Sequence, residues 1–118
     1  MIEISDIPDW CAVETMGSHH VYDEKEAIDV SLMLSKSPFK WIDKVTAPTL
    51  MMLGNEDKRV PMSQGRKWYW GLRARGVETK CYVYPDKHGL QKVDVDSDAF
   101  VNIMIWILSR LDSTGERK

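Results

Sequence analysis

Two polar residues, Asp57 and His88, are of the types that serve as acid and base in a catalytic triad, and each follows a short strand-like segment. Asp57 comes shortly after the apolar run 50–53, and His88 lies just beyond residues 79–84. A carboxylate can orient an imidazole and stabilise its charged form, and the imidazole can then take a proton from a nucleophile. The pair therefore indicates hydrolase chemistry, in which a third group attacks the substrate.

Other residues compete for these two roles on spacing alone. Glu56 adjoins Asp57, and Asp86 is close enough to His88 in sequence to pair with it locally. Arg59 could pair with Glu56 or Asp57, which would make the acids part of a structural ion pair. Because a histidine in a loop is more often a solvated surface residue than a base, spacing alone leaves both the triad and the structural interpretation open.

No recognisable nucleophile accompanies the pair. In α/β-hydrolases the nucleophilic serine lies in a Gly-x-Ser-x-Gly turn, and the triad runs in the order Ser, Asp, His. That pattern does not occur in the 118 residues, since Gly17-Ser18-His19 lacks the second glycine and a preceding strand. Cys81 lies within an expected strand, which favours a small buried filler over a nucleophile. We therefore expect the serine to lie N-terminal to Met1.

Composition argues against several other classes of function. The formal net charge of −2 gives no electrostatic attraction for nucleic acid or an anionic membrane, and no apolar run approaches the ~20 residues of a membrane span. No zinc site is expected, because the adjacent His19 and His20 have no Cys or further His at a zinc-ligand spacing. Cys11 and Cys81 lack a local partner, which predicts reduced thiols in a cytoplasmic protein.

Alternating strands and helices determine the expected fold. Residues 49–53 and 79–84 are short, apolar or rich in strand-favouring residues, and therefore predict strands. Between them, residues 61–75 have helical spacing, with Gly65 permitting close approach to the sheet and Gly76 suited to a left-handed cap. A strand, a crossover helix and a second strand favour parallel pairing, which brings both candidate residues to one rim of the sheet.

Three further segments flank this unit. Residues 6–9 are expected to form a turn, because Pro8 disfavours helix in the residue before it. A helix capped by Asp23 is expected over residues 24–34, and a final helix over residues 98–111. The final helix should bury an apolar stripe formed by Phe100, Ile103, Met104, Ile107, Leu108 and Leu111.

The expected sheet is too small to stand alone. Two parallel strands cannot form a well-covered sheet, and an open edge of such a sheet tends to pair with other chains. Five tryptophans in a chain of this length also imply more apolar surface than two strands and their helices cover. We therefore interpret the chain as part of an α/β domain.

Six segments spread over most of the chain carry the motifs of one known family. They are Ser5–Cys11, Lys36–Ile42, Pro48–Pro61, Gln64-Gly65, Tyr84–Leu90 and Val93–Asn102. The Gly-x-x-Asp-x-Arg-Val-Pro and Tyr-Pro-x-x-His patterns resemble those of the prolyl oligopeptidase family of serine peptidases. Asp-Ile-Pro-Asp-Trp and the acidic Val-Asp-Val-Asp-Ser-Asp run resemble its acylaminoacyl-peptidase branch more narrowly.

The resemblance implies a place and a role for the chain. Residues 1–118 would be the C-terminal portion of a catalytic α/β-hydrolase domain, incomplete as a domain, without the part that bears the nucleophile and without the family's β-propeller. Asp57 would be the triad acid and His88 the base, so that Glu56 and Asp86 lose their candidacy. The family uses a serine and neither metal nor cofactor, and it is cytoplasmic and often oligomeric.

The resemblance also implies a reaction and a set of partners. We expect a serine-type exopeptidase (an omega peptidase) that releases N-acyl amino acids from blocked peptide N-termini, with these 118 residues inactive alone. Expected partners are the N-acylated peptide, the remainder of the catalytic domain and further copies of the enzyme. The alternative is a short non-catalytic module that binds a partner, or the full-length enzyme, through its exposed sheet edge.

Overall fold

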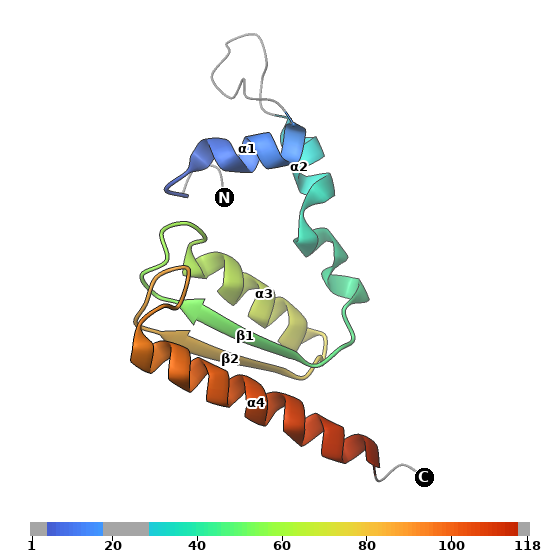
Figure 1. The fold of residues 1–118 in the computed structure, drawn as a ribbon. Helices are drawn as coiled ribbons and strands as arrows, with labels where there is room; N and C mark the ends of the chain where they lie inside the picture. The colour runs from blue at the N-terminus through green and yellow to red at the C-terminus, as the bar shows by residue number, and fades with distance from the viewer. Residues whose placement is uncertain (1–4, 18–28, 116–118) are drawn as a thin grey trace.

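The computed structural model describes residues 5–17 and 29–115 (Figure 1). The expected cap Asp23 and the pair His19 and His20 lie outside these residues. No helix in the described ranges is long and apolar enough to cross a membrane. The elements in chain order are α1 (Pro8–Met16), α2 (Val30–Lys36), the 3₁₀ segment η1 (Pro38–Lys44), β1 (Thr49–Gly54), α3 (Met62–Ala74), β2 (Thr79–Tyr84) and α4 (Val93–Gly115).

Strands β1 and β2 form a parallel pair, as the sequence predicts. The register runs from Thr49 opposite Thr79 to Gly54 opposite Tyr84, so both strands end at the same rim. The described part of the chain contains no further strand. This arrangement is consistent with one portion of an α/β sheet.

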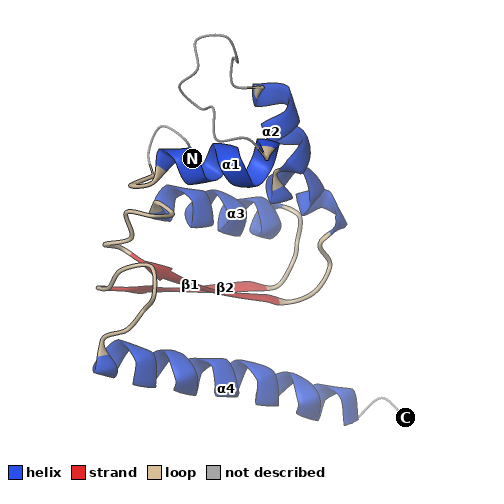
Figure 2. Cartoon of the chain, turned by 45° about the horizontal axis from the view of Figure 1, so that its top comes forward, coloured by secondary structure: helices blue, strands red, loops and turns tan. Residues whose placement is uncertain are grey.

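Helices α3 and α4 lie on opposite faces of this sheet (Figure 2). On the α3 face, a Cβ at Gly65 would lie 2.4 Å from Leu53 Cδ2, so the expected close approach is confirmed. Leu72 of α3 is fully buried. The helix ends one residue before Arg75, and Gly76 adopts the expected left-handed conformation at φ 78°.

Helix α4 packs on the other face over a narrow area. Tyr84, Val95 and Ala99 form a small core with Met52, Tyr82 and Leu90 packed against it. The helix starts at Val93, five residues earlier than the sequence predicts, and extends to Gly115. The expected buried stripe is wrong for this chain: its six side chains are exposed, from 39% for Ile103 and Met104 to 64% for Phe100. Two strands offer too little surface to cover a helix of this length.

The N-terminal part differs from the prediction in two places. The expected turn at residues 6–9 is wrong beyond Ile7, because Pro8 occupies the first turn of α1, where a proline has no hydrogen bond to lose. The expected helix at 24–34 is wrong at Asp29, which lies outside the helix and caps α2 by accepting the backbone N–H of Leu32 at 2.9 Å.

The molecule is more extended than a compact domain. Its radius of gyration is 17.6 Å, with principal extents of 60 × 35 × 22 Å. A compact domain of this length has a radius of gyration of about 13.5 Å. Helix α4 projects beyond the strands, and α1 and α2 lie beyond α3 (Figures 1 and 2), which explains the difference.

Candidate active site

Asp57 and His88 meet at the rim where the two strands end. Asp57 belongs to the turn after β1, and His88 to the loop after β2. Asp57 Oδ2 lies 2.8 Å from His88 Nδ1, a hydrogen bond between residues 31 positions apart. The contact expected from a parallel strand–helix–strand unit is therefore present.

The surroundings of Asp57 favour a charged carboxylate. Its other oxygen, Oδ1, accepts the backbone N–H groups of Arg59 and Val60, both at 2.9 Å. Burial opposes ionisation of the carboxyl, whose side chain is 10% exposed, but the hydrogen bonds from His88, Val60 and Arg59 outweigh it. The pKa of Asp57 is consequently held below its ordinary value of 3.8. At neutral pH the carboxylate is an acceptor only.

The imidazole of His88 is oriented by this acceptor. Because the carboxylate cannot donate, Nδ1 of His88 must carry the proton in the 2.8 Å hydrogen bond. In the neutral ring, Nε2 then has a free lone pair and can accept a proton. The side chain of His88 is 57% exposed, so a group from solvent or from another polypeptide can reach it. The pair has the arrangement of a general base and its orienting acid.

The two rival acids are engaged elsewhere. Glu56 Oε1 lies 3.5 Å from Lys92 Nζ in an exposed ion pair. Asp86 is buried, and its two oxygens accept the backbone N–H groups of Lys87 at 2.7 Å and Lys92 at 2.8 Å. The structure therefore brings Asp57, and neither rival, to the ring of His88.

The segment before α1 reaches the turn that carries Asp57. Arg59 Nε pairs with Asp6 Oδ1 at 3.2 Å, which argues against the alternative in which the Arg59 side chain pairs with Glu56 or Asp57. Ser5 Oγ donates to the carbonyl of Arg59 at 2.9 Å, and the backbone N–H of Asp6 donates to Lys58 O at 2.9 Å. These contacts join residues more than fifty positions apart, which no local pattern predicts.

Gly54, the first residue of the Gly-x-x-Asp-x-Arg-Val-Pro pattern, makes a contact that the sequence does not predict. A Cβ here would lie 2.4 Å from Asp86 O and 2.5 Å from Lys87 O, so the two loops touch through their backbones. Next to it, the backbone N–H of Glu56 donates to Asp86 O at 3.0 Å. The available signal is a glycine that follows the apolar run 50–53 and begins the family pattern, and neither feature shows that a second loop packs against it.

The remaining candidates lie away from this rim. Cys11 and Cys81 are free thiols, and burial raises the pKa of the Cys81 thiol although Arg66 acts against the shift. Cys81 lies in the middle of β2 and is half-buried, whereas the sequence favours a fully buried residue. Across residues 5–17 and 29–115, no group of His, Cys, Asp and Glu is arranged to hold a metal ion.

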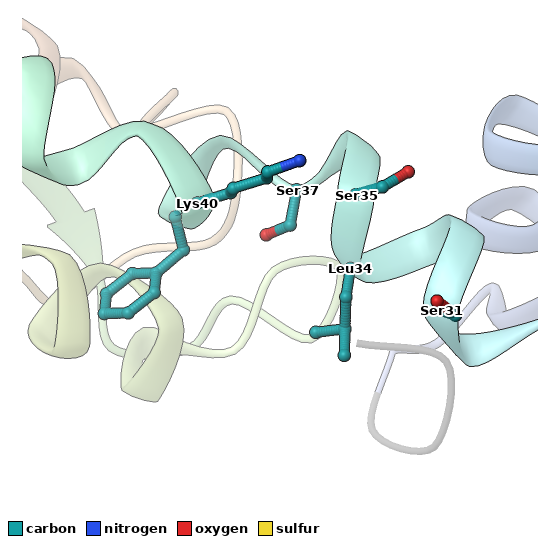
Figure 3. Close-up of a pocket in the computed structure, with 6 residues that line it drawn as sticks. Ser31, Leu34, Ser35, Ser37 and Lys40 are labelled. Carbon is teal, nitrogen blue, oxygen red and sulfur yellow. The ribbon is translucent and has the colours of Figure 1, made fainter.

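A hollow of about 410 Å³ lies between α2 and η1 (Figure 3). Its lining combines serine hydroxyls with Leu34 and the stem of Lys40, and includes neither Asp57 nor His88. It is therefore separate from the candidate site. The lining residues are Ser31, Leu34, Ser35, Ser37, Phe39 and Lys40.

Known proteins match the chain over nearly its whole length. Residues 4–114 match the model of the prolyl oligopeptidase family. The chain is 44% identical over 115 residues to the acylamino-acid-releasing enzyme of Mus musculus and 42% identical over 115 residues to that of Homo sapiens, covering 96% of this chain and 16% of each relative. It is 43% identical over 108 residues to the enzyme of Arabidopsis thaliana, covering 90% of this chain and 14% of that protein. The chain thus spans about one sixth of the length of these relatives.

Proposed function

This chain belongs to the prolyl oligopeptidase family, and from that premise we propose that it supplies the acid and the base of a serine peptidase active site. The observation that carries the proposal is the 2.8 Å hydrogen bond between Asp57 Oδ2 and His88 Nδ1. Family membership implies an α/β-hydrolase fold, and the parallel pair β1–β2 with a helix on each face is consistent with part of it.

In the proposed reaction, a serine contributed by polypeptide outside these 118 residues attacks the carbonyl carbon of the scissile amide. His88 Nε2 takes the serine proton, and Asp57 stabilises the imidazolium that forms. The imidazolium then gives its proton to the leaving amine, so that the peptide is released and an acyl-enzyme remains. Water next attacks the ester, with the same imidazole as base, and regenerates the serine.

The proposed substrate is a peptide with a blocked N-terminus. The relatives are named acylamino-acid-releasing enzymes, and from their names we infer that an N-acyl amino acid is the product. Residues 1–118 would then be the C-terminal part of the catalytic domain of such an omega peptidase, which would contain further polypeptide and could form oligomers. Two free thiols in the described residues support a cytoplasmic location.

The second candidate is a non-catalytic module that binds a partner or the full-length enzyme. Two observations favour it. Within the described residues the sheet has two strands, so an edge of each is open, and most large apolar side chains of α4 are exposed. Both features are also expected of a piece of a larger domain, so we place this candidate second.

A chimeric enzyme tests the first proposal. This chain would replace the matching 115 residues of the mouse enzyme, and hydrolysis of an N-acetylated peptide would be measured. Asp57→Asn and His88→Ala should each lower kcat by about 10⁴-fold with the fold intact. Asp43→Asn changes an exposed carboxylate remote from the rim and should leave kcat unchanged.

Two results would contradict the proposal. One is near-normal turnover in either rim variant. The other is a well-folded chimera without activity, combined with stable binding of the 118-residue chain to the intact mouse enzyme; that combination would favour the non-catalytic module instead.

A further inference from the structure

We propose that Asp86 is a positioning residue, whose buried carboxylate holds the loop 87–92 in the shape that places His88 against Asp57. The proposal rests on the proposed function of the Asp57–His88 pair, and it assigns a role to a residue outside that pair. It also explains why a charged side chain is buried at the rim.

The carboxylate of Asp86 closes the loop from inside. Oδ1 accepts the backbone N–H of Lys87 at 2.7 Å, and Oδ2 accepts that of Lys92 at 2.8 Å, so one side chain bridges both ends of the segment that contains His88. The residue is 4% exposed. A buried carboxylate is costly unless its oxygens are satisfied, and here backbone donors satisfy them.

The charged form of Asp86 is the form that these donors stabilise. The backbone N–H of Lys92 is the largest influence; burial opposes it, and the N–H of Lys87 adds to it, so that the pKa of Asp86 lies below its ordinary value. The positive charge of the Lys92 ammonium also lowers the pKa of Asp86. The same ammonium donates to Pro85 O and pairs with Glu56. The ionised carboxylate therefore persists at neutral pH.

The main chain of Asp86 ties this loop to the turn that carries Asp57. Its carbonyl accepts the backbone N–H of Glu56 at 3.0 Å, and Gly54 packs directly against the carbonyls of Asp86 and Lys87. The carboxylate fixes the shape of the His88 loop, and the carbonyl fixes its distance from the Asp57 turn. Both act from one residue.

The loop adopts a conformation that needs such support. Leu90 has φ 47°, the left-handed region that is costly for a side chain branched beyond Cβ. Its side chain packs against the small core of Tyr84, Val95 and Ala99, and its N–H donates to Lys87 O at 3.3 Å. Two interactions thus offset the strain at Leu90. Its side chain packs on the small core, and the hydrogen bonds of the Asp86 carboxylate to Lys87 and Lys92 hold the two ends of the loop that contains it.

Packing alone does not hold His88. The side chain is 57% exposed, so the position of the ring follows the position of its backbone. A displacement of about 1 Å at a catalytic group can cost about 10²-fold in rate. Release of the bridge should therefore loosen the His88–Asp57 hydrogen bond while β1, β2 and α3 stay folded.

Nuclear magnetic resonance of the ¹⁵N-labelled 118-residue chain tests the proposal directly. The proton on His88 Nδ1 should be visible in the wild-type chain, because the hydrogen bond to Asp57 slows its exchange with water. Asp57→Asn and Asp86→Ala should both lose this signal. Asp86→Asn keeps one acceptor oxygen and should show a weaker signal. The matched control Asp29→Ala also removes a carboxylate that accepts a backbone N–H, but far from the rim, and should keep the signal.

The outcomes separate this proposal from the proposed function. A full wild-type signal in Asp86→Ala overturns the positioning role, and so does the absence of such a proton from a wild-type chain that circular dichroism shows to be folded. In an active chimera with the mouse enzyme, Asp86→Ala should lower kcat by about 10²-fold with little change in KM, and unchanged kcat also overturns it. If Asp86→Ala removes the proton signal but the wild-type chimera hydrolyses nothing, the positioning role stands and the peptidase proposal fails.

Discussion

The rim and helix α4 differ in how completely this chain determines them. At the rim, two loops from separate strands meet through backbone hydrogen bonds, a buried carboxylate and a glycine contact, and the partners of Asp57 and Asp86 lie within the chain. Along α4, by contrast, large apolar side chains from Phe100 to Leu111 remain exposed. The described residues of this chain therefore hold the geometry of the candidate site, whereas they leave the apolar face of the neighbouring helix α4 exposed.

The largest effect is expected from replacing Gly54, where the loops that carry Asp57 and His88 touch. Gly54→Ala would place a methyl group 2.4–2.5 Å from two backbone carbonyls, which cannot move without separating the loops. We expect loss of the His88 Nδ1 proton signal, and destabilisation by about 1–3 kcal/mol from overpacking, measured by urea unfolding. Gly71→Ala is the matched control, since its methyl group would meet side-chain atoms of Ile42 and Phe39 outside the rim. Equal effects of both variants would show that the Gly54 contact is not special.

Low pH should lower the free energy of unfolding by protonating two carboxylates at the rim, those of Asp57 and Asp86. The pKa values of Asp57 and Asp86 are both below the ordinary 3.8, so folding favours their charged forms. The stability that they contribute is complete above the unfolded-state value of 3.8 and is lost as the pH falls through the folded-state values. The free energy of unfolding should therefore decline below about pH 4. The double variant Asp57→Asn, Asp86→Asn should show a smaller decline, and an identical decline would contradict the assignment.

The smallest effect on stability is expected on α4, where two exposed isoleucines can be replaced separately. Ile107 lies on the same helix face as Phe100 and Leu111, whereas Ile105 points to a different face, and both are exposed in this chain. In the isolated chain, Ile107→Lys and Ile105→Lys should each change stability by no more than about 0.5 kcal/mol.

The same two substitutions should differ once further polypeptide is present. An apolar stripe of this size usually marks an interface, so in the chimera with the mouse enzyme Ile107→Lys should lower the thermal midpoint more than Ile105→Lys. Equal midpoints for the two chimeras would mean that the stripe stays uncovered there.

The parts of the fold that the sequence predicts are those with strong local patterns. The strand at residues 79–84 is predicted to the residue, and the contact of Asp57 with His88 follows from a parallel crossover. The helix α1 was missed because Pro8 suits both a turn and a first helical turn. The burial of α4 was overestimated, because an amphipathic pattern shows which face is apolar and not whether this chain supplies its cover.

The missed site residues depend on contacts between distant backbones. Gly54 meets two backbone carbonyls, and the Asp86 carboxylate accepts backbone N–H groups. Every residue has such backbone groups, so the motif that contains Gly54 does not show which loop packs against it. Asp86 instead looked like a competitor for His88, because it lies two positions away in sequence. Only the geometry shows that its oxygens face the loop backbone.

Labelling of natively expressed material with a serine-directed fluorophosphonate probe tests the central proposal most directly. The labelled chain would be detected with an antibody raised against these 118 residues. We expect a labelled band far heavier than 13.6 kDa, in which an activated serine accompanies Asp57 and His88. A band found only at 13.6 kDa, without label, would contradict the peptidase proposal and favour the binding module.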